Sequence, residues 1–373
     1  MFRSLLSSLY SAFVARRNSK FDAGKGVHRV DVPVISVGNV SVGGTGKSPF
    51  VILLANTLLR MGYSPAIVSR GYGRRSRGIV LVSNGKQIQS SVETAGDELT
   101  MIAHALPHCV VIAAEQRFLG ATRVLREFPD VDIIILDDGF QHRALARDVD
   151  IVLVDRPTLD APTVVPAGVL REPLANLKRA SLVVCTPGVH VHEVQPFTSA
   201  PVIFARTEFR GCTRLQSEHS TADSENNTAD SKDSPAGSMD SPADSMYSPA
   251  DVSVPTPRRA VLVTAIANAH RVLQSCKDLG VEIAHHAEFR DHYFYTAKDV
   301  ESIIALCKQH QCSVVLTTAK DAPKLRQWLR EFNDNDIQLL VLRIETVCEP
   351  PEMPEEFLKN VLRDFSSRGI STR

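Results

Sequence analysis

The sequence lacks an excess of charge, a long apolar run and paired cysteines. Lys and Arg number 42, as do Asp and Glu, which argues against general binding to nucleic acid because such proteins carry a marked basic excess. No apolar run reaches the roughly 18 residues of a spanning helix. The seven cysteines are scattered without a C-x-x-C pair, so a zinc ribbon is not expected and the thiols are typical of a reducing compartment.

The length and composition are those of a globular protein with more than one domain. The chain has 373 residues, of which 43% are hydrophobic and 23% charged. At roughly 150 residues per domain, this length predicts two domains, each able to bury a core.

Residues 1–26 predict an amphipathic helix followed by basic charge. The apolar residues recur at helical spacing, and they are Phe2, Leu5, Leu6, Leu9, Phe13 and Val14. The apolar part is short and interrupted by serines, and most of the basic residues follow it, unlike a signal peptide. Two interpretations stay open: a helix packed on the protein, or a helix in a membrane interface with its basic residues on anionic headgroups.

A glycine-rich loop lies between a predicted strand and a predicted helix. Residues 32–37 are rich in β-branched side chains, and the apolar stretch 50–61 ends at Gly62, a natural helix cap. This is the context of a phosphate loop. The candidate nucleotide-binding residues are Ser41, Val42, Gly43, Gly44, Thr45, Gly46, Lys47 and Ser48.

Each part of this loop has a chemical role toward a nucleotide. Glycines let backbone N–H groups surround phosphate oxygens at a helix N-terminus. Lys47 would reach the β and γ phosphates, and Ser48 would offer its hydroxyl to Mg²⁺. Ser41 departs from the usual pattern, which has glycine there. The alternative is a glycine-rich turn that only caps a helix.

Two adjacent carboxylates, Asp137 and Asp138, follow the apolar run 131–136. An apolar strand that ends in a carboxylate beside a phosphate loop is the usual magnesium-site arrangement, because ligands gather at the carboxyl ends of parallel strands. The alternative is an Asp-Asp-Gly turn without a metal.

Two other segments have both structural and functional interpretations. Asp97 comes three residues after Thr94, a capping-box spacing, so taken alone it is a carboxylate at a helix start. The loop 69–78 holds four arginines and three glycines. It is either a solvated turn or a site for an anionic substrate or nucleotide phosphate.

The ordered series of motifs resembles the tetraacyldisaccharide 4′-kinase (lipid A 4′-kinase) family of Gram-negative bacteria. The resemblance covers nearly the whole chain except roughly 215–256. Its elements are S-V-G-N-x-S-V-G-G-T-G-K-S-P, S-R-G-Y-G-R, G-D-E, D-D-G-F-Q-H, P-A-G-x-L-R-E-P, F-x-D-H and T-x-K-D.

The resemblance implies a peripheral kinase on the cytoplasmic face of the inner membrane. Such an enzyme moves the ATP γ-phosphate to the 4′-hydroxyl of a tetraacylated glucosamine disaccharide 1-phosphate and gives lipid IV(A). ATP and Mg²⁺ are the implied cofactors, the disaccharide lipid and the membrane surface are the implied partners, and no protein partner is inferred. The implied fold is α/β, a phosphate-loop NTPase-like core with a second, smaller α/β lobe, an N-terminal amphipathic helix and an active site between the lobes.

Carried onto this sequence, the resemblance assigns roles to individual residues. Asp97 matches the general base, and His292, next to Asp291, matches the histidine that pairs with it. Asp138 matches the magnesium-site acid, with Asp137 and Gln141 lining the same site, and Arg117 matches an active-site arginine.

Residues 221–255 repeat with a period of seven, as in TADSKDS, PAGSMDS and PADSMYS. Recurrent proline and the lack of an apolar seam exclude a coiled coil, and the composition predicts a disordered insert. Strand-like runs at 259–264 and 313–317 with a helix over 300–309 predict the second lobe. The expected organisation is a helix over 1–26, a kinase lobe over 27–214, an insert over 215–256 and a C-terminal lobe over 257–373.

Two alternatives to a lipid kinase remain open from the sequence. The first is a phosphate-loop regulatory GTPase or metallochaperone, although T-A-K-D at 318–321 differs from the guanine-reading [NT]-K-x-D and no Cys/His metal motif is present. The second is a kinase for a soluble small molecule.

Overall fold

The computed structural model describes residues 2–216 and 252–367, which divide into two compact units. Unit 1 comprises 1–103, 107–208 and 345–373, and unit 2 comprises 104–106 and 209–344. Most of the predicted disordered insert lies outside the described residues. The sequence predicts that the second lobe runs to the C-terminus, whereas the chain after residue 344 belongs to unit 1.

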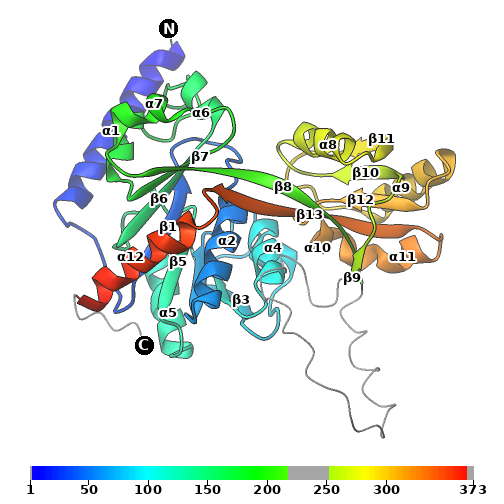
Figure 1. Cartoon of the computed structure of the whole chain (residues 1–373), viewed down its shortest axis with the longest axis horizontal. Helices are drawn as coiled ribbons and strands as arrows, with labels where there is room; N and C mark the ends of the chain where they lie inside the picture. Colours follow the sequence, from blue (N-terminus) through cyan, green and yellow to red (C-terminus); the bar gives the residue numbers. More distant parts are fainter. Residues whose placement is uncertain (1, 217–251, 368–373) are drawn as a thin grey trace, which may run out of the picture. The chain divides into compact units, whose positions relative to one another are not determined.

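Unit 1 contains a mostly parallel sheet with helices around it (Figure 1). Its strands are β1 (Val34–Asn39), β2 (Pro65–Ser69), β3 (Val80–Asn84), β4 (Val110–Ala113), β5 (Ile133–Asp137), β6 (Val149–Val154), β7 (Leu182–Cys185) and the first part of β8 (Val202–Arg214). Its helices are α1 (Phe2–Asp22), α2 (Lys47–Arg60), α3 (Val92–Ala95), α4 (Asp97–Ala105), α5 (Arg117–Glu127), α6 (Arg156–Asp160), η1 (Leu174–Arg179), α7 (Val191–Val194), η2 (Gln195–Phe197) and α12 (Met353–Ser367).

The strand order in unit 1 is β8-β7-β6-β1-β5-β2-β4-β3. All neighbouring strands are parallel except β3 and β4. Every residue of β1, β5 and β6 is buried, as expected of central parallel strands that are covered on both faces. The predicted strands at 32–37 and 131–136 are thus present, each shifted by one or two residues.

Helix α2 directly follows the glycine-rich loop and packs on β1, β5 and β2. Its inner face is apolar and includes Phe50, Leu54 and Leu58, all almost fully buried. The helix ends where Gly62 adopts a left-handed φ of 86° and donates its N–H to Leu59 O, which confirms the predicted cap. Helix α12 packs against α2.

Unit 2 is a second, smaller α/β unit. Its strand order is β11-β10-β12-β13-β8, and β9 pairs with β8 in the antiparallel direction. The strands are β9 (Val252–Val254), β10 (Arg259–Thr264), β11 (Glu282–Glu288), β12 (Val314–Thr317) and β13 (Gln338–Glu349), and the helices are α8 (Ala269–Asp278), α9 (Ala297–Gln309), α10 (Ala322–Leu325), η3 (Arg326–Trp328) and α11 (Leu329–Asn333). Strands β8 and β13 each have one part in either unit.

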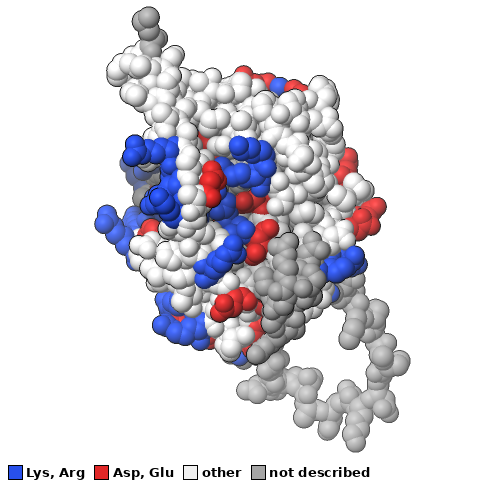
Figure 2. Space-filling model, turned by 90° about the vertical axis from the view of Figure 1, so that its left-hand side faces the viewer, with Lys and Arg blue, Asp and Glu red and all other residues white. Residues whose placement is uncertain are grey.

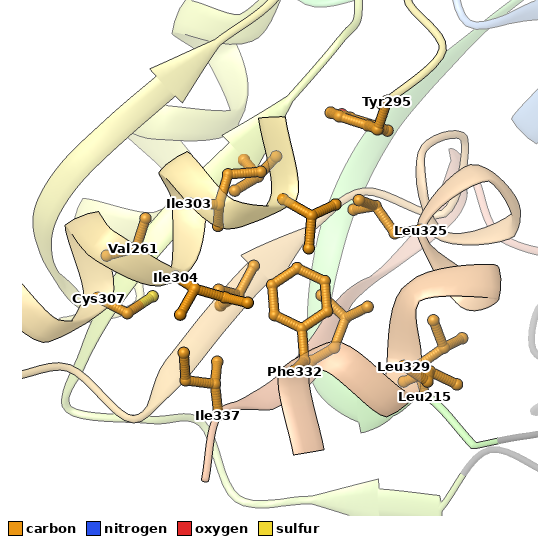
Figure 3. Close-up of a cluster of buried hydrophobic side chains, with 14 of the residues drawn as sticks. Leu215, Val261, Tyr295, Ile303, Ile304, Cys307, Leu325, Leu329, Phe332 and Ile337 are labelled. Atoms are coloured by element: carbon orange, nitrogen blue, oxygen red, sulfur yellow. The ribbon is translucent and has the colours of Figure 1, made fainter. Parts of the chain in front are cut away.

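Phe332 lies in the middle of the hydrophobic core of unit 2 (Figure 3). Its side chain is fully buried among residues of α9, β10 and α10, which include Ile303, Val261 and Leu325. The one tryptophan of the chain, Trp328, packs against the same cluster.

We predict that Phe332→Ala lowers the free energy of unfolding of unit 2 by about 3–5 kcal/mol, because it leaves a cavity in this core. Urea denaturation followed by the fluorescence of Trp328 measures the change in this unit. Lys298→Ala, on the exposed side of α9, is the control and should change the value by less than about 0.5 kcal/mol. A loss as small as that of the control would show that this core relaxes around the missing ring.

Candidate active site

The glycine-rich loop connects the end of β1 to the start of α2 in unit 1 (Figure 1). Gly43 and Gly46 adopt left-handed φ values of 112° and 86°, a conformation that favours glycine. Lys47 is the first residue of α2, and Ser48 is buried in its first turn. The loop therefore has the strand–loop–helix context that the sequence predicts.

Lys47 lies across this loop and reaches the carboxylate site. Its Nζ donates to Gly43 O at 3.4 Å and forms an ion pair with Asp138 Oδ1 at 3.5 Å. The Val42 amide donates to Val169 O at 2.7 Å. The Val42 N–H is therefore already bonded within the protein. The residue itself is 47% exposed.

Ser41, the departure from the usual pattern, has its own hydrogen-bond partners. Its buried Oγ accepts from Thr158 Oγ1 at 2.8 Å and from Asn39 Nδ2 at 3.4 Å. Asn39 also donates to Thr45 Oγ1 at 3.1 Å. The serine hydroxyl thereby ties the start of the loop to α6 and to the end of β1.

Asp137 and Asp138 stand at the carboxyl end of β5, next to β1. Asp137 is buried, and its Oδ2 accepts from Ser69 Oγ at 2.9 Å. Asp138 has a left-handed φ of 49° and faces two cations, because Arg171 NH1 lies 2.7 Å from its Oδ2 and Lys47 approaches its Oδ1.

The two carboxylates have opposite electrostatic environments. Burial first, and then the charges of Glu98 and Asp138, raise the pKa of Asp137 to about 7. The pKa of Asp138 is lowered despite the opposing effect of burial, because Lys47 and Arg171 stabilise its charge. Arg117 is also buried here, and burial lowers its pKa while both Asp side chains oppose that shift.

This chemistry fits a divalent cation. The Oδ1 atoms of Asp137 and Asp138 are buried and accept no hydrogen bond from the described residues. Among residues 2–216 and 252–367, no group of three or more His, Cys, Asp or Glu side chains forms a complete metal site. Mg²⁺ commonly takes one or two carboxylates and completes its ligands with water and phosphate oxygens, and Ser48 lies one residue after Lys47.

The other candidate residues are divided between the two units. Asp97 begins α4 in unit 1, is 3% exposed, and accepts the N–H of Glu98 on its Oδ1 at 3.0 Å. It is thus a carboxylate at a helix N-terminus, as its position in the sequence indicates. In unit 2, His292 has a φ of 61°, and its Nε2 lies 3.5 Å from Asp291 Oδ2. Lys320 Nζ holds the other oxygen of Asp291 at 3.0 Å.

Gln141 joins the phosphate loop to residues that sequence reasoning did not single out. Its Nε2 donates to Asn39 O at 2.7 Å and to Glu172 Oε1 at 2.8 Å, and its Oε1 accepts from Arg171 at 3.4 Å. Arg171 and Glu172 lie in the P-A-G-x-L-R-E-P motif, which gave a signal but no role. The contact of Ser69 with Asp137 could have been predicted from the sequence, because Ser69 ends the strand β2, which pairs with β5.

Comparison of the whole chain with known proteins identifies its family. The tetraacyldisaccharide-1-P 4′-kinase family matches residues 2–363. This chain belongs to that family. A tetraacyldisaccharide 4′-kinase of Chlorobium phaeovibrioides is 35% identical over 97% of both chains, and that of Aquifex aeolicus is 33% identical over 89% of this chain and 93% of its own. A crystal structure of Aquifex aeolicus LpxK in complex with ATP has a TM-score of 0.72 at 30% identity and covers 97% of this chain and 99% of that one.

Membership of the tetraacyldisaccharide-1-P 4′-kinase family confirms the expected α/β, phosphate-loop fold with an N-terminal helix. It does not favour a regulatory GTPase or a metallochaperone.

The environment of Asp137 predicts how stability depends on pH in the metal-free protein. Its pKa in the folded protein, about 7, exceeds the ordinary value of roughly 4 for an unfolded chain. The folded state therefore keeps a proton that the unfolded state has released, and stability falls as pH rises from about 4 to about 7. Asp137→Asn should remove this contribution, so that its melting temperature exceeds that of the wild type at pH 8 more than at pH 5.

Thermal melts with chelator at both pH values measure the effect. Asp31→Asn, at an exposed position, is the control. If the gain from Asp137→Asn were equal at pH 5 and pH 8, the proton of Asp137 would have no part in it.

Proposed function

We propose that this protein transfers the γ-phosphate of ATP to the 4′-hydroxyl of a tetraacylated glucosamine disaccharide 1-phosphate and so forms lipid IV(A). The observation that carries the proposal is the family match over residues 2–363, together with a phosphate loop whose Lys47 lies 3.5 Å from a magnesium-type carboxylate, Asp138. A kinase needs these two groups side by side, because phosphoryl transfer depends on positioning and on stabilising the charge of the phosphates.

The residues of unit 1 supply the binding of the nucleotide. Loop amides and the N-terminus of α2 would hold the phosphate oxygens, and Lys47 would leave Asp138 for the β and γ phosphates. Ser48 and the carboxylates Asp138 and Asp137 would hold Mg²⁺, whose charge would offset that of the phosphates. The buried guanidinium of Arg117 adds positive charge beside both carboxylates.

The family resemblance assigns proton transfer to Asp97 and His292. Asp97 begins α4 and is almost fully buried, so the position of its carboxylate is fixed by the fold. A loose transition state asks little of a base, so the main role of Asp97 is to orient the hydroxyl and accept its proton late. The resemblance gives His292, which lies next to Asp291 in unit 2, the role of passing that proton on.

We expect Lys47→Ala to lower the turnover of ATP-dependent lipid phosphorylation by roughly two to three orders of magnitude, since a preorganised charge on the transferred group is lost. The assay uses the purified disaccharide 1-phosphate lipid, and the product is identified by mass. Lys86→Ala, in the exposed turn after β3, should retain activity. Near-normal turnover of Lys47→Ala would contradict the phosphate-loop assignment, and phosphorylation of soluble sugars in place of the lipid would contradict the acceptor.

A double-mutant cycle tests the roles of Asp97 and His292. Asp97→Ala and His292→Ala should each lower kcat far more than they weaken ATP binding, and the double variant should be little worse than either single variant, as for residues that act as a unit. Steady-state kinetics and ATP titration provide the two readouts. Multiplicative losses in the double variant would leave Asp97 as a helix-terminal carboxylate without a coupled partner.

We further propose that the protein binds the membrane surface peripherally through α1, on the cytoplasmic face. No helix in the described ranges 2–216 and 252–367 is long and apolar enough to cross a membrane. Large apolar side chains of α1 are nevertheless exposed, namely Phe2 at 72%, Leu5 at 60%, Leu9 at 61% and Phe13 at 62%. Figure 2 shows Lys and Arg side chains gathered on the face of unit 1 where α1 lies, which suits anionic headgroups.

The double change Leu5→Ser and Leu9→Ser should weaken binding to vesicles of anionic phospholipid at least tenfold, because each leucine contributes roughly 2 kcal/mol when its side chain leaves water. Sedimentation with vesicles measures the binding. The change Ala12→Ser and Ala15→Ser, at exposed positions of the same helix, is the control. Equal binding of both variants would place the membrane contact elsewhere.

A further inference from the structure

Glu172 is a fully buried carboxylate with five hydrogen bonds. Its relative exposure is 0%. Arg179 NH2 donates to both of its oxygens, at 3.1 and 3.0 Å, and neutralises its charge. Three amides complete the shell: Gln141 donates to Oε1 at 2.8 Å, while Asn176 and Asn18 donate to Oε2 at 2.7 and 3.2 Å. A buried charge with this many donors holds each donor in place.

The donors come from separate parts of unit 1. Asn18 belongs to α1, the helix with the exposed apolar side chains, whereas Asn176 and Arg179 belong to η1. The guanidinium of Arg179 also stacks on Phe140, with its central carbon 4.3 Å from the ring centre. Gln141, the next residue, follows β5 beside the carboxylate pair. One buried carboxylate thus connects α1 to the turn that carries Asp138.

From Gln141, the contacts continue to the phosphate loop. The Nε2 atom that bonds Glu172 also donates to Asn39 O at the end of β1. Its Oε1 accepts from Arg171 NH1 at 3.4 Å, and the same NH1 lies 2.7 Å from Asp138 Oδ2. The orientation of the Gln141 amide therefore matters. If the amide turned over, its NH₂ group would face the NH1 group of Arg171, and two hydrogen-bond donors would oppose each other.

We propose that Glu172 and Asn18 are positioning residues. Through them, the packing of α1 against the rest of unit 1 sets the geometry of the nucleotide site. With Asn18 in place, Oε2 of Glu172 is held and Oε1 keeps the Gln141 amide in the orientation that supports Arg171 and Asp138. Because coupling between two sites is reciprocal, a nucleotide bound at the loop in turn favours the seated helix. This inference rests on the proposed function, since it concerns the same phosphate site.

The structure offers a matched control on the same helix. Ser7 is the other buried polar anchor of α1: its Oγ donates to Val164 O at 2.8 Å and accepts from Ala167 N at 3.0 Å. Ser7 and Asn18 are 5% and 6% exposed. Ser7 holds α1 to the protein without contacting Glu172, so its loss loosens the helix but leaves the Glu172 shell intact.

The experiment compares Asn18→Ala with Ser7→Ala in the full chain. We expect Asn18→Ala to lower kcat and to weaken the affinity for ATP by roughly fivefold, a typical coupling, and Ser7→Ala to change both less than twofold, with melting temperatures and vesicle binding measured alongside. In a Gln141→Ala background, Asn18→Ala should have no further effect on ATP affinity.

Two results would overturn the proposal: equal effects of Asn18→Ala and Ser7→Ala, or an undiminished effect of Asn18→Ala in the Gln141→Ala background. Because ATP affinity is measured without the lipid, the coupling is judged even if the wild-type protein fails to phosphorylate the disaccharide. That failure would count against the proposed function alone.

Discussion

The parallel pairing of β1 with β5 is the constraint on which the site depends. Its register places Val37 opposite Asp137, so the strand that leads into the phosphate loop ends beside the strand that carries the carboxylates. Two glycines allow this approach. A Cβ on Gly38 would lie 2.6 Å from Phe140 Cβ, and one on Gly139 would lie 2.7 Å from Ser36 Oγ. Any side chain at either position would push the turn after β5 away from β1.

Once the two strands are paired, burial and charge differentiate the adjacent carboxylates. Asp138 points toward Lys47 and Arg171, which keep it ionised, while Asp137 is buried beside Ser69 and has its pKa raised. Additional positive charge near the pair would make it easier for both carboxylates to be ionised at the same time. Nucleotide-bound Mg²⁺ would bring that charge, because a divalent cation favours the ionised form of a neighbouring carboxylate. Under the proposed function, the protonation of Asp137 would thus be linked to the binding of the metal.

The parts of the site that were predictable from the sequence are local ones. Lys47, Ser48 and the pair Asp137 and Asp138 each directly follow a glycine-rich or strand-like run, and strand neighbours in a parallel sheet bring such ends together. The strand 259–264 was predicted at its exact bounds, because an apolar run between turn residues defines it. The shell of Glu172 could not be predicted, because Asn18 lies 154 residues away and only the fold brings the two together. The partners of Ser41 were hidden for the same reason, since Thr158 lies 117 residues further along the chain.

Helix α1 shows how a pattern can be identified correctly while the face that packs remains open. Apolar residues recur along it at helical spacing, and on an ordinary surface helix that face would lie against the core. In this structure Phe2, Leu5, Leu9 and Phe13 are exposed, and the buried contacts include polar anchors such as Asn18. Hydrogen bonds are directional, so these polar anchors fix the rotation of the helix about its axis. Apolar packing alone would permit several rotations. The same polar contacts that turn the apolar face outward also join the helix to Glu172, so one set of hydrogen bonds serves both the surface of the protein and its nucleotide site.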